Sequence, residues 1–103
     1  MSNTDKLKEE ILSSRGSVLI DFYAPWCGPC RVQKSILKYF MEDYGDNVKL
    51  IAVDIDNNEE LSEHFNIRSV PTILFMKDGK VLSRKSGIQS EEALLKMIYS
   101  QPH

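Results

Sequence analysis

Two cysteines separated by two residues lie where a buried strand meets a helix. Cys27 and Cys30 are the only cysteines of the chain. They follow the nearly continuous apolar run 18–23 and precede apolar side chains that recur at helical spacing as far as Tyr44. A strand with this pattern is buried on both faces, and a helix that directly follows it begins a right-handed βαβ unit. The junction therefore predicts an α/β fold that contains a parallel pair of strands.

The spacing of the cysteines predicts a dithiol that cycles to a disulfide. The first turn of a helix offers unpaired backbone N–H groups and a partial positive charge, which stabilise a thiolate, the reactive form of cysteine. We expect Cys27, before the helix, to be the exposed and attacking sulfur, and Cys30 to be the shielded sulfur that resolves a mixed disulfide. The alternative is half of a zinc site, for which only His64 and His103 remain as ligands of the right kind, at unsuitable spacing.

The remaining pattern predicts one domain over residues 1–103. Apolar periodicity indicates helices between Thr4 and Gly16, over residues 30–44, around Leu61, and after Ser90, with further strands over 48–53, 72–76 and 81–83. Asp78-Gly79 separates the last two strands and is typical of a hairpin turn. Together these elements predict a mixed four-stranded sheet with helices on both faces.

Composition and charge argue against nucleic acids and membranes as partners of this chain. A formal net charge of −2 gives no electrostatic reason to expect nucleic acid or an anionic membrane as a partner. We expect the basic cluster Lys77, Lys80, Arg84 and Lys85 to be a solvated hairpin edge. The polar N-terminus does not resemble a secretory signal, and no segment approaches the ~20 apolar residues of a membrane span. The expected location is the cytoplasm, where a cycling disulfide is more plausible than a structural one.

Asp21 interrupts the apolar strand, so its carboxyl group should lie in or beside the core. Burial disfavours the charged form and raises the pKa of a carboxyl, which can then exchange a proton near neutral pH. The alternative is an aspartate at a strand end that bonds to nearby N–H groups. Asp54 and Asp56, before an Asn-rich turn, are expected to cap that turn or to be solvated.

The segment 22–30, Phe-Tyr-Ala-Pro-Trp-Cys-Gly-Pro-Cys, resembles the active-site segment of the thioredoxin family. The strand end 53–56, the segment 68–72, the Asp78-Gly79 turn and Gly87 match the same family in order, so the resemblance spans roughly residues 5–99. It implies a thioredoxin-like fold and thiol–disulfide oxidoreduction, most simply the reduction of protein disulfides. It also implies that Asp21 exchanges a proton with Cys30.

The resemblance assigns further residues around the cysteines. Gly28 and Pro29 would shape the redox-active loop, since proline fits the first turn of a helix. Trp26 would be a partly exposed platform for substrate, although a large ring can equally belong to a core. The implied substrate rim consists of Val70, Pro71, Gly87 and Ile88, with a cis bond before Pro71. Without the resemblance, a trans proline that starts an edge strand and a simple turn glycine at position 87 are the plainer interpretations.

The chain departs from the family pattern in four places. The usual first strand is missing or very short, because few residues precede the first helix. Tyr23 replaces a tryptophan beside the site, and Ser35 replaces a proline that kinks the long helix. Ala52 stands where a lysine often lies near the buried acid, which alters the expected proton-transfer network.

The resulting hypothesis is a monomeric protein-disulfide reductase without a bound cofactor or metal. The chain has no Gly-x-Gly-x-x-Gly run for a dinucleotide. The resemblance therefore implies that electrons come from NADPH through a separate flavoprotein thioredoxin reductase, and that substrates are several disulfide-containing proteins. Two alternatives remain, a disulfide oxidant or isomerase, and a redox-independent binding subunit or holdase that uses the apolar rim.

Overall fold

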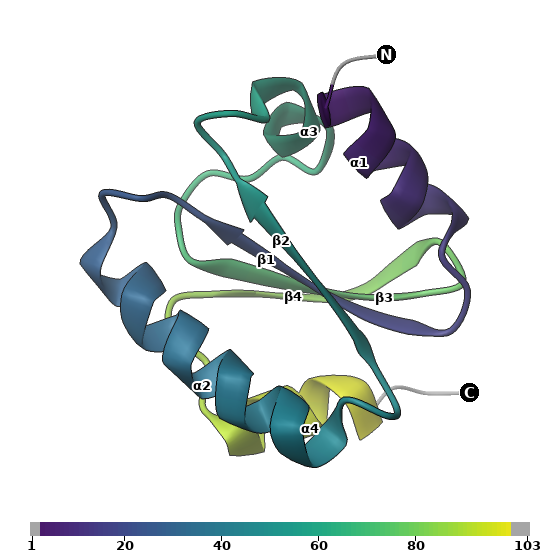
Figure 1. Cartoon of the computed structure of the whole chain (residues 1–103), viewed down its shortest axis with the longest axis vertical. Coiled ribbons are helices and arrows are strands. Elements are labelled where there is room, and N and C mark those ends of the chain that lie inside the picture. The colour runs from purple at the N-terminus through teal and green to yellow at the C-terminus, as the bar shows by residue number, and fades with distance from the viewer. Residues whose placement is uncertain (1–2, 100–103) are drawn as a thin grey trace.

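A computed structural model describes residues 3–99, which form one four-stranded sheet and four helices (Figure 1). In chain order the elements are α1 (Asn3–Ser13), β1 (Ser17–Tyr23), α2 (Gly28–Tyr44), β2 (Lys49–Asp54), α3 (Glu59–His64), β3 (Thr72–Lys77), β4 (Lys80–Ser86) and α4 (Glu91–Tyr99). The predicted order of elements is confirmed. The strand β4 is longer than its predicted range 81–83, because most of its side chains are exposed and polar and it is held chiefly by backbone pairing with β3.

The sheet has the strand order β2-β1-β3-β4. The central strand β1 is parallel to β2 and antiparallel to β3, and β4 is antiparallel to β3, so the predicted mixed sheet is confirmed. Within residues 3–99 no strand precedes α1, and β2 forms one edge of the sheet. Figure 1 shows this edge in front, between the two helical layers.

Helices cover both faces of the sheet, as predicted. Below α1 and α3, the alternate β1 residues Val18, Ile20 and Phe22 pack into one apolar core. Leu19 points to the opposite face, where α2 and α4 enclose the second core. Because side chains alternate along a strand, Asp21 lies on the same face as Leu19 and points towards α2.

The hairpin between β3 and β4 contains the predicted Asp-Gly turn. Asp78 and Gly79 have φ values of 51° and 82°, the left-handed backbone that a two-residue hairpin loop requires. The basic cluster on this hairpin is exposed, as expected for a solvated edge. Arg84 has a more specific role than predicted, because its guanidinium donates hydrogen bonds to the carbonyl oxygens of Phe65 and Asn66.

Among the described residues, no helix combines the length and the apolar character needed to cross a bilayer.

Candidate active site

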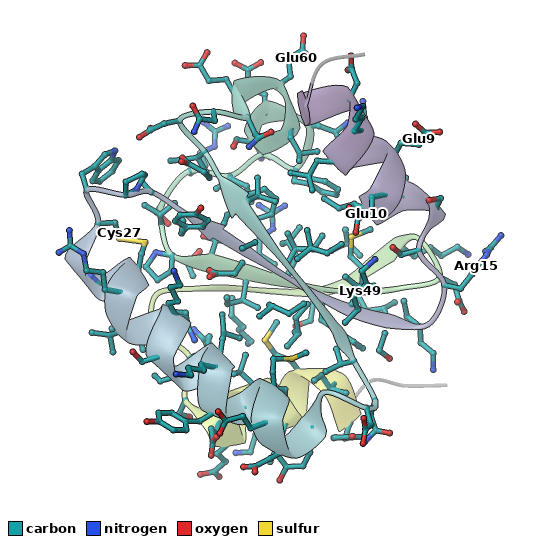
Figure 2. All side chains as sticks on the ribbon, in the orientation of Figure 1. Glu9, Glu10, Arg15, Cys27, Lys49 and Glu60 are labelled. Atoms are coloured by element: carbon teal, nitrogen blue, oxygen red, sulfur yellow. A yellow bond between two sulfur atoms is a disulfide. The ribbon has the colours of Figure 1, made fainter. Side chains whose placement is uncertain are left out.

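Cys27 and Cys30 form a disulfide at the N-terminus of α2, with their Cα atoms 5.3 Å apart. Cys27 is the N-cap residue, and the backbone N–H of Cys30 donates a hydrogen bond of 3.1 Å to Cys27 Sγ. Pro29 occupies the first turn, where the helix needs no N–H from it. Figure 2 shows the sulfur–sulfur bond beside the labelled Cys27. The partial positive charge of the helix and a directed N–H group therefore both act on the Cys27 sulfur.

The prediction that Cys27 is the exposed member of the pair is wrong for this oxidised form. The exposed fraction is 5% for Cys27 and 4% for Cys30. Both residues pack in a small apolar cluster with Ala24, and Tyr23 and Val70 lie against that cluster. A sequence pattern shows the place of a cysteine relative to a helix, but not the neighbouring loops that cover it.

Asp21 is buried between the sheet and α2, as predicted, with an exposed fraction of 4%. Its register partners are Ala52 on β2 and Ile73 on β3. Its Oδ1 atom is buried without a hydrogen-bond partner, whereas the alternative expected a carboxylate bonded to nearby N–H groups. Burial raises the pKa of Asp21 to about 6, and the positive charge of Lys34 partly opposes this rise.

A groove of about 720 Å³ opens along α2 and reaches both Asp21 and Cys30. Its walls combine apolar side chains with three cationic side chains of α2, Arg31, Lys34 and Lys38. Ala52 and Ser35, two of the departures from the family pattern, also line it. The groove gives a buried carboxyl and the Cys30 side of the disulfide a shared route to solvent.

A second loop lies against the disulfide. The carbonyl oxygen of Val70 is 3.8 Å from Cys27 Sγ. The peptide bond between Val70 and Pro71 is cis, as the resemblance implies. The N–H of Gly87 donates a hydrogen bond of 2.9 Å to the carbonyl oxygen of Pro71, and Ile88 is exposed beside it. The structure therefore places the loop with Gly87 and Ile88 against the Val70–Pro71 loop, and Val70 itself lies against the cysteines.

Trp26 is 67% exposed, which agrees with a surface platform rather than a core residue. Its indole N–H donates a hydrogen bond of 3.0 Å to Asp56 Oδ2. This contact adds to the predicted role of Asp56, which was to cap a turn or to be solvated. Asp54 does stabilise the turn, since its carboxylate accepts hydrogen bonds from the N–H of Asp56 and the side chain of Asn57.

Gln33 is a further site residue that the sequence pattern did not predict. It is fully buried in α2, with an exposed fraction of 0%. Its side-chain amide bonds to both backbone groups of Gln89, 56 positions away. One signal was available, because Gln33 follows Cys30 by three residues and precedes Leu37 by four, and such residues share a helix face.

Within residues 3–99, no three side chains of the His, Cys, Asp and Glu types gather where they could hold a metal ion. His103, which the zinc alternative invoked, lies outside the described residues.

The sequence and the fold of this chain are similar to those of known proteins. The thioredoxin family model matches residues 1–100. The thioredoxin of Bacillus subtilis (strain 168) is 38% identical over 86 residues, covering 84% of this chain and 83% of that protein. The thioredoxin of Rickettsia bellii is 38% identical over 96 residues, covering 92% and 91% respectively. Mitochondrial thioredoxin 3 of Saccharomyces cerevisiae, solved in its oxidised form, superimposes with a TM-score of 0.83 at 27% identity, covering 97% of this chain and 92% of that one.

Proposed function

This chain belongs to the thioredoxin family and is a thiol–disulfide reductase, and on that premise we propose that it reduces protein disulfides through Cys27, Cys30 and Asp21. The observation that carries the proposed roles is the hydrogen bond from the Cys30 N–H to Cys27 Sγ at the N-terminus of α2. This arrangement favours a thiolate at Cys27 in the reduced protein.

In the first step, the Cys27 thiolate attacks one sulfur of a substrate disulfide. A bond forms between Cys27 and that sulfur, the substrate disulfide breaks, and the other substrate sulfur leaves as a thiolate that takes up a proton. The backbone of Val70, 3.8 Å from Cys27 Sγ, is placed to pair with an extended substrate segment. Trp26, next to Cys27 in the sequence, and Ile88, next to Gly87, supply exposed apolar surface.

In the second step, Cys30 resolves the mixed disulfide. Asp21 takes the proton of the Cys30 thiol through the groove that both residues line, and the resulting thiolate attacks Cys27 Sγ. The mixed disulfide breaks and releases the second substrate thiolate, which Asp21 reprotonates. A pKa of about 6 lets Asp21 accept and return a proton near neutral pH.

The two steps reduce one substrate disulfide to two thiols and oxidise the Cys27/Cys30 pair by two electrons. Restoring the Cys27 thiolate and the Cys30 thiol for the next cycle needs two electrons and one proton, which together equal one hydride. We propose that NADPH supplies this hydride equivalent through a separate flavoprotein thioredoxin reductase, so this chain carries no cofactor of its own. We further propose that residues 1–103 act as one monomeric domain in the cytoplasm, where they contribute to electron transport and cell redox homeostasis.

Trapping the mixed disulfide tests these roles. The Cys30→Ser variant should form a stable covalent adduct with an oxidised protein substrate such as insulin, because the resolving sulfur is absent. The matched Cys27→Ser variant should form no adduct at neutral pH, and both variants should lose catalytic insulin reduction with NADPH and a flavoprotein thioredoxin reductase. Adducts that form equally through Cys30 would contradict the assignment of Cys27 as the nucleophile.

A further inference from the structure

The side-chain amide of Gln33 is bonded at both ends to the backbone of Gln89. Its Oε1 atom accepts a hydrogen bond of 2.6 Å from the Gln89 N–H, and its Nε2 group donates one of 3.1 Å to the Gln89 carbonyl oxygen. The pair joins α2, which carries Cys30, to the loop that carries Gly87 and Ile88. Because Gln33 is completely buried, no solvent competes for these two bonds.

Gln89 in turn fixes the rest of its loop. Its side-chain amide donates hydrogen bonds to the carbonyl oxygens of Ser86, at 3.2 Å, and Gly87, at 3.1 Å. The N–H of Gly87 bonds to the carbonyl oxygen of Pro71, whose neighbour Val70 contacts Cys27. A chain of polar contacts therefore runs from α2 through the loop 87–89, here called the rim loop, to the Val70–Pro71 loop and back to Cys27.

The fully buried side chain of Gln33 ties the loop 87–89 to α2 by two hydrogen bonds. An apolar side chain of similar length fits the same space but leaves the N–H and the carbonyl of Gln89 without partners. A buried backbone group without a partner is costly, so the loop would move to expose Gln89 to water. Such movement would displace Ile88, which follows Gly87 in the loop that bonds to Pro71.

We propose that Gln33 is a positioning residue that holds the rim loop 87–89 in register with Cys27, and thereby sets the preference for protein disulfides over small disulfides. The inference rests on the proposed function, because it assigns the rim loop to substrate binding. A protein substrate contacts the rim as well as the sulfur. A small disulfide needs only the sulfur, so it should not depend on where the loop lies.

The test compares the Gln33→Met variant with wild type on two substrates. With insulin, a flavoprotein thioredoxin reductase and NADPH, KM should rise about 5- to 10-fold while kcat changes less than about twofold, the size expected for losing one or two buried hydrogen bonds. The rate constant of the reduced protein with 5,5′-dithiobis(2-nitrobenzoate) should stay within about twofold. Amide hydrogen exchange at Gln89 should accelerate at least about tenfold, which reports the loop independently of activity.

Two matched variants separate positioning from general stability. Leu37→Met alters a buried residue of the same helix that packs in the core, and should leave the ratio of the two substrate activities unchanged. Gln89→Ala removes the bonds to Ser86 and Gly87 from a partly exposed side chain, and should raise KM for insulin in the same direction as Gln33→Met. If Gln33→Met does not fold, the same comparison of the two substrates can be made with Gln89→Ala.

The positioning role would be overturned if Gln33→Met lost activity equally with insulin and with the small disulfide. It would also be overturned if both the amide exchange of Gln89 and the KM for insulin were unchanged in this variant. The proposed function fails separately, and this inference with it, if the wild-type protein reduces the small disulfide but not insulin.

Discussion

The carboxylate of Asp56 accepts a hydrogen bond of 3.0 Å from the indole N–H of Trp26, across 30 positions of sequence. The contact joins the loop before Cys27 to the turn after β2. Asp54 holds that turn by accepting a hydrogen bond of 2.9 Å from the N–H of Asp56. A ring that is two-thirds exposed is thus held in one orientation beside the disulfide, as a substrate platform requires.

The Asp56→Ala variant should release the Trp26 ring. Because Trp26 is the only tryptophan, its fluorescence anisotropy reports this ring alone, and we expect it to fall in the variant. KM for insulin should rise about 2- to 5-fold, the effect of losing one exposed hydrogen bond to a charged group. Asp46→Ala removes an exposed carboxylate from another turn and serves as the control. Unchanged anisotropy in Asp56→Ala would show that packing, not this bond, holds the ring.

The Asp21→Asn variant should be more stable than wild type at pH 7. The pKa of Asp21 is raised by burial from 3.8 to about 6, so the folded protein binds more protons than the unfolded chain between these values. Stability therefore falls as pH rises through this window, and the loss is complete above pH 6. At 1.36 kcal/mol per pKa unit, removing the charge should increase the free energy of unfolding by at most about 3 kcal/mol.

Urea unfolding of the oxidised proteins at several pH values measures this difference. The advantage of Asp21→Asn should be full above pH 6 and should vanish below pH 3.8, where wild-type Asp21 is neutral in both states. A stability difference that does not change with pH would mean that Asp21 is not a buried, titrating carboxyl.

The Lys34→Met variant should raise the pKa of Asp21 further. The positive charge of Lys34 favours the ionised carboxyl, and this variant removes it while burial remains. Carboxyl ¹³C chemical shifts followed by NMR would give the pKa directly. Lys38→Met, which changes another cation of the same groove, is the control and should have the smaller effect. A lowered pKa in Lys34→Met would contradict the role of Lys34.

Sequence patterns predicted the parts of this molecule that depend on local chemistry. The Asp78-Gly79 turn, the buried position of Asp21 and the place of Cys27 before α2 follow from backbone propensity, apolar periodicity and helix capping. The cis bond at Pro71 could be expected only from the family resemblance.

Contacts between distant polar residues were not predictable in the same way. Gln33 bonds to backbone atoms of Gln89, so no complementary side chain at the other end marks the pair in the sequence. Asp56 has the same turn-like surroundings as Asp54, and only the folded chain shows that Trp26 reaches it. Equal burial of Cys27 and Cys30 likewise depends on Val70, which joins them from a loop 40 residues later.

The midpoint potential of the Cys27/Cys30 couple is the most direct test of the central claim that this pair is a reductant of protein disulfides. It can be measured by equilibrating the protein with graded dithiothreitol buffers and following the thiols. We predict a potential close to the value of about −270 mV that is characteristic of thioredoxins. A potential near −120 mV, roughly that of a strong disulfide oxidant, would contradict a reductase, as would a pair that cannot be reduced at all.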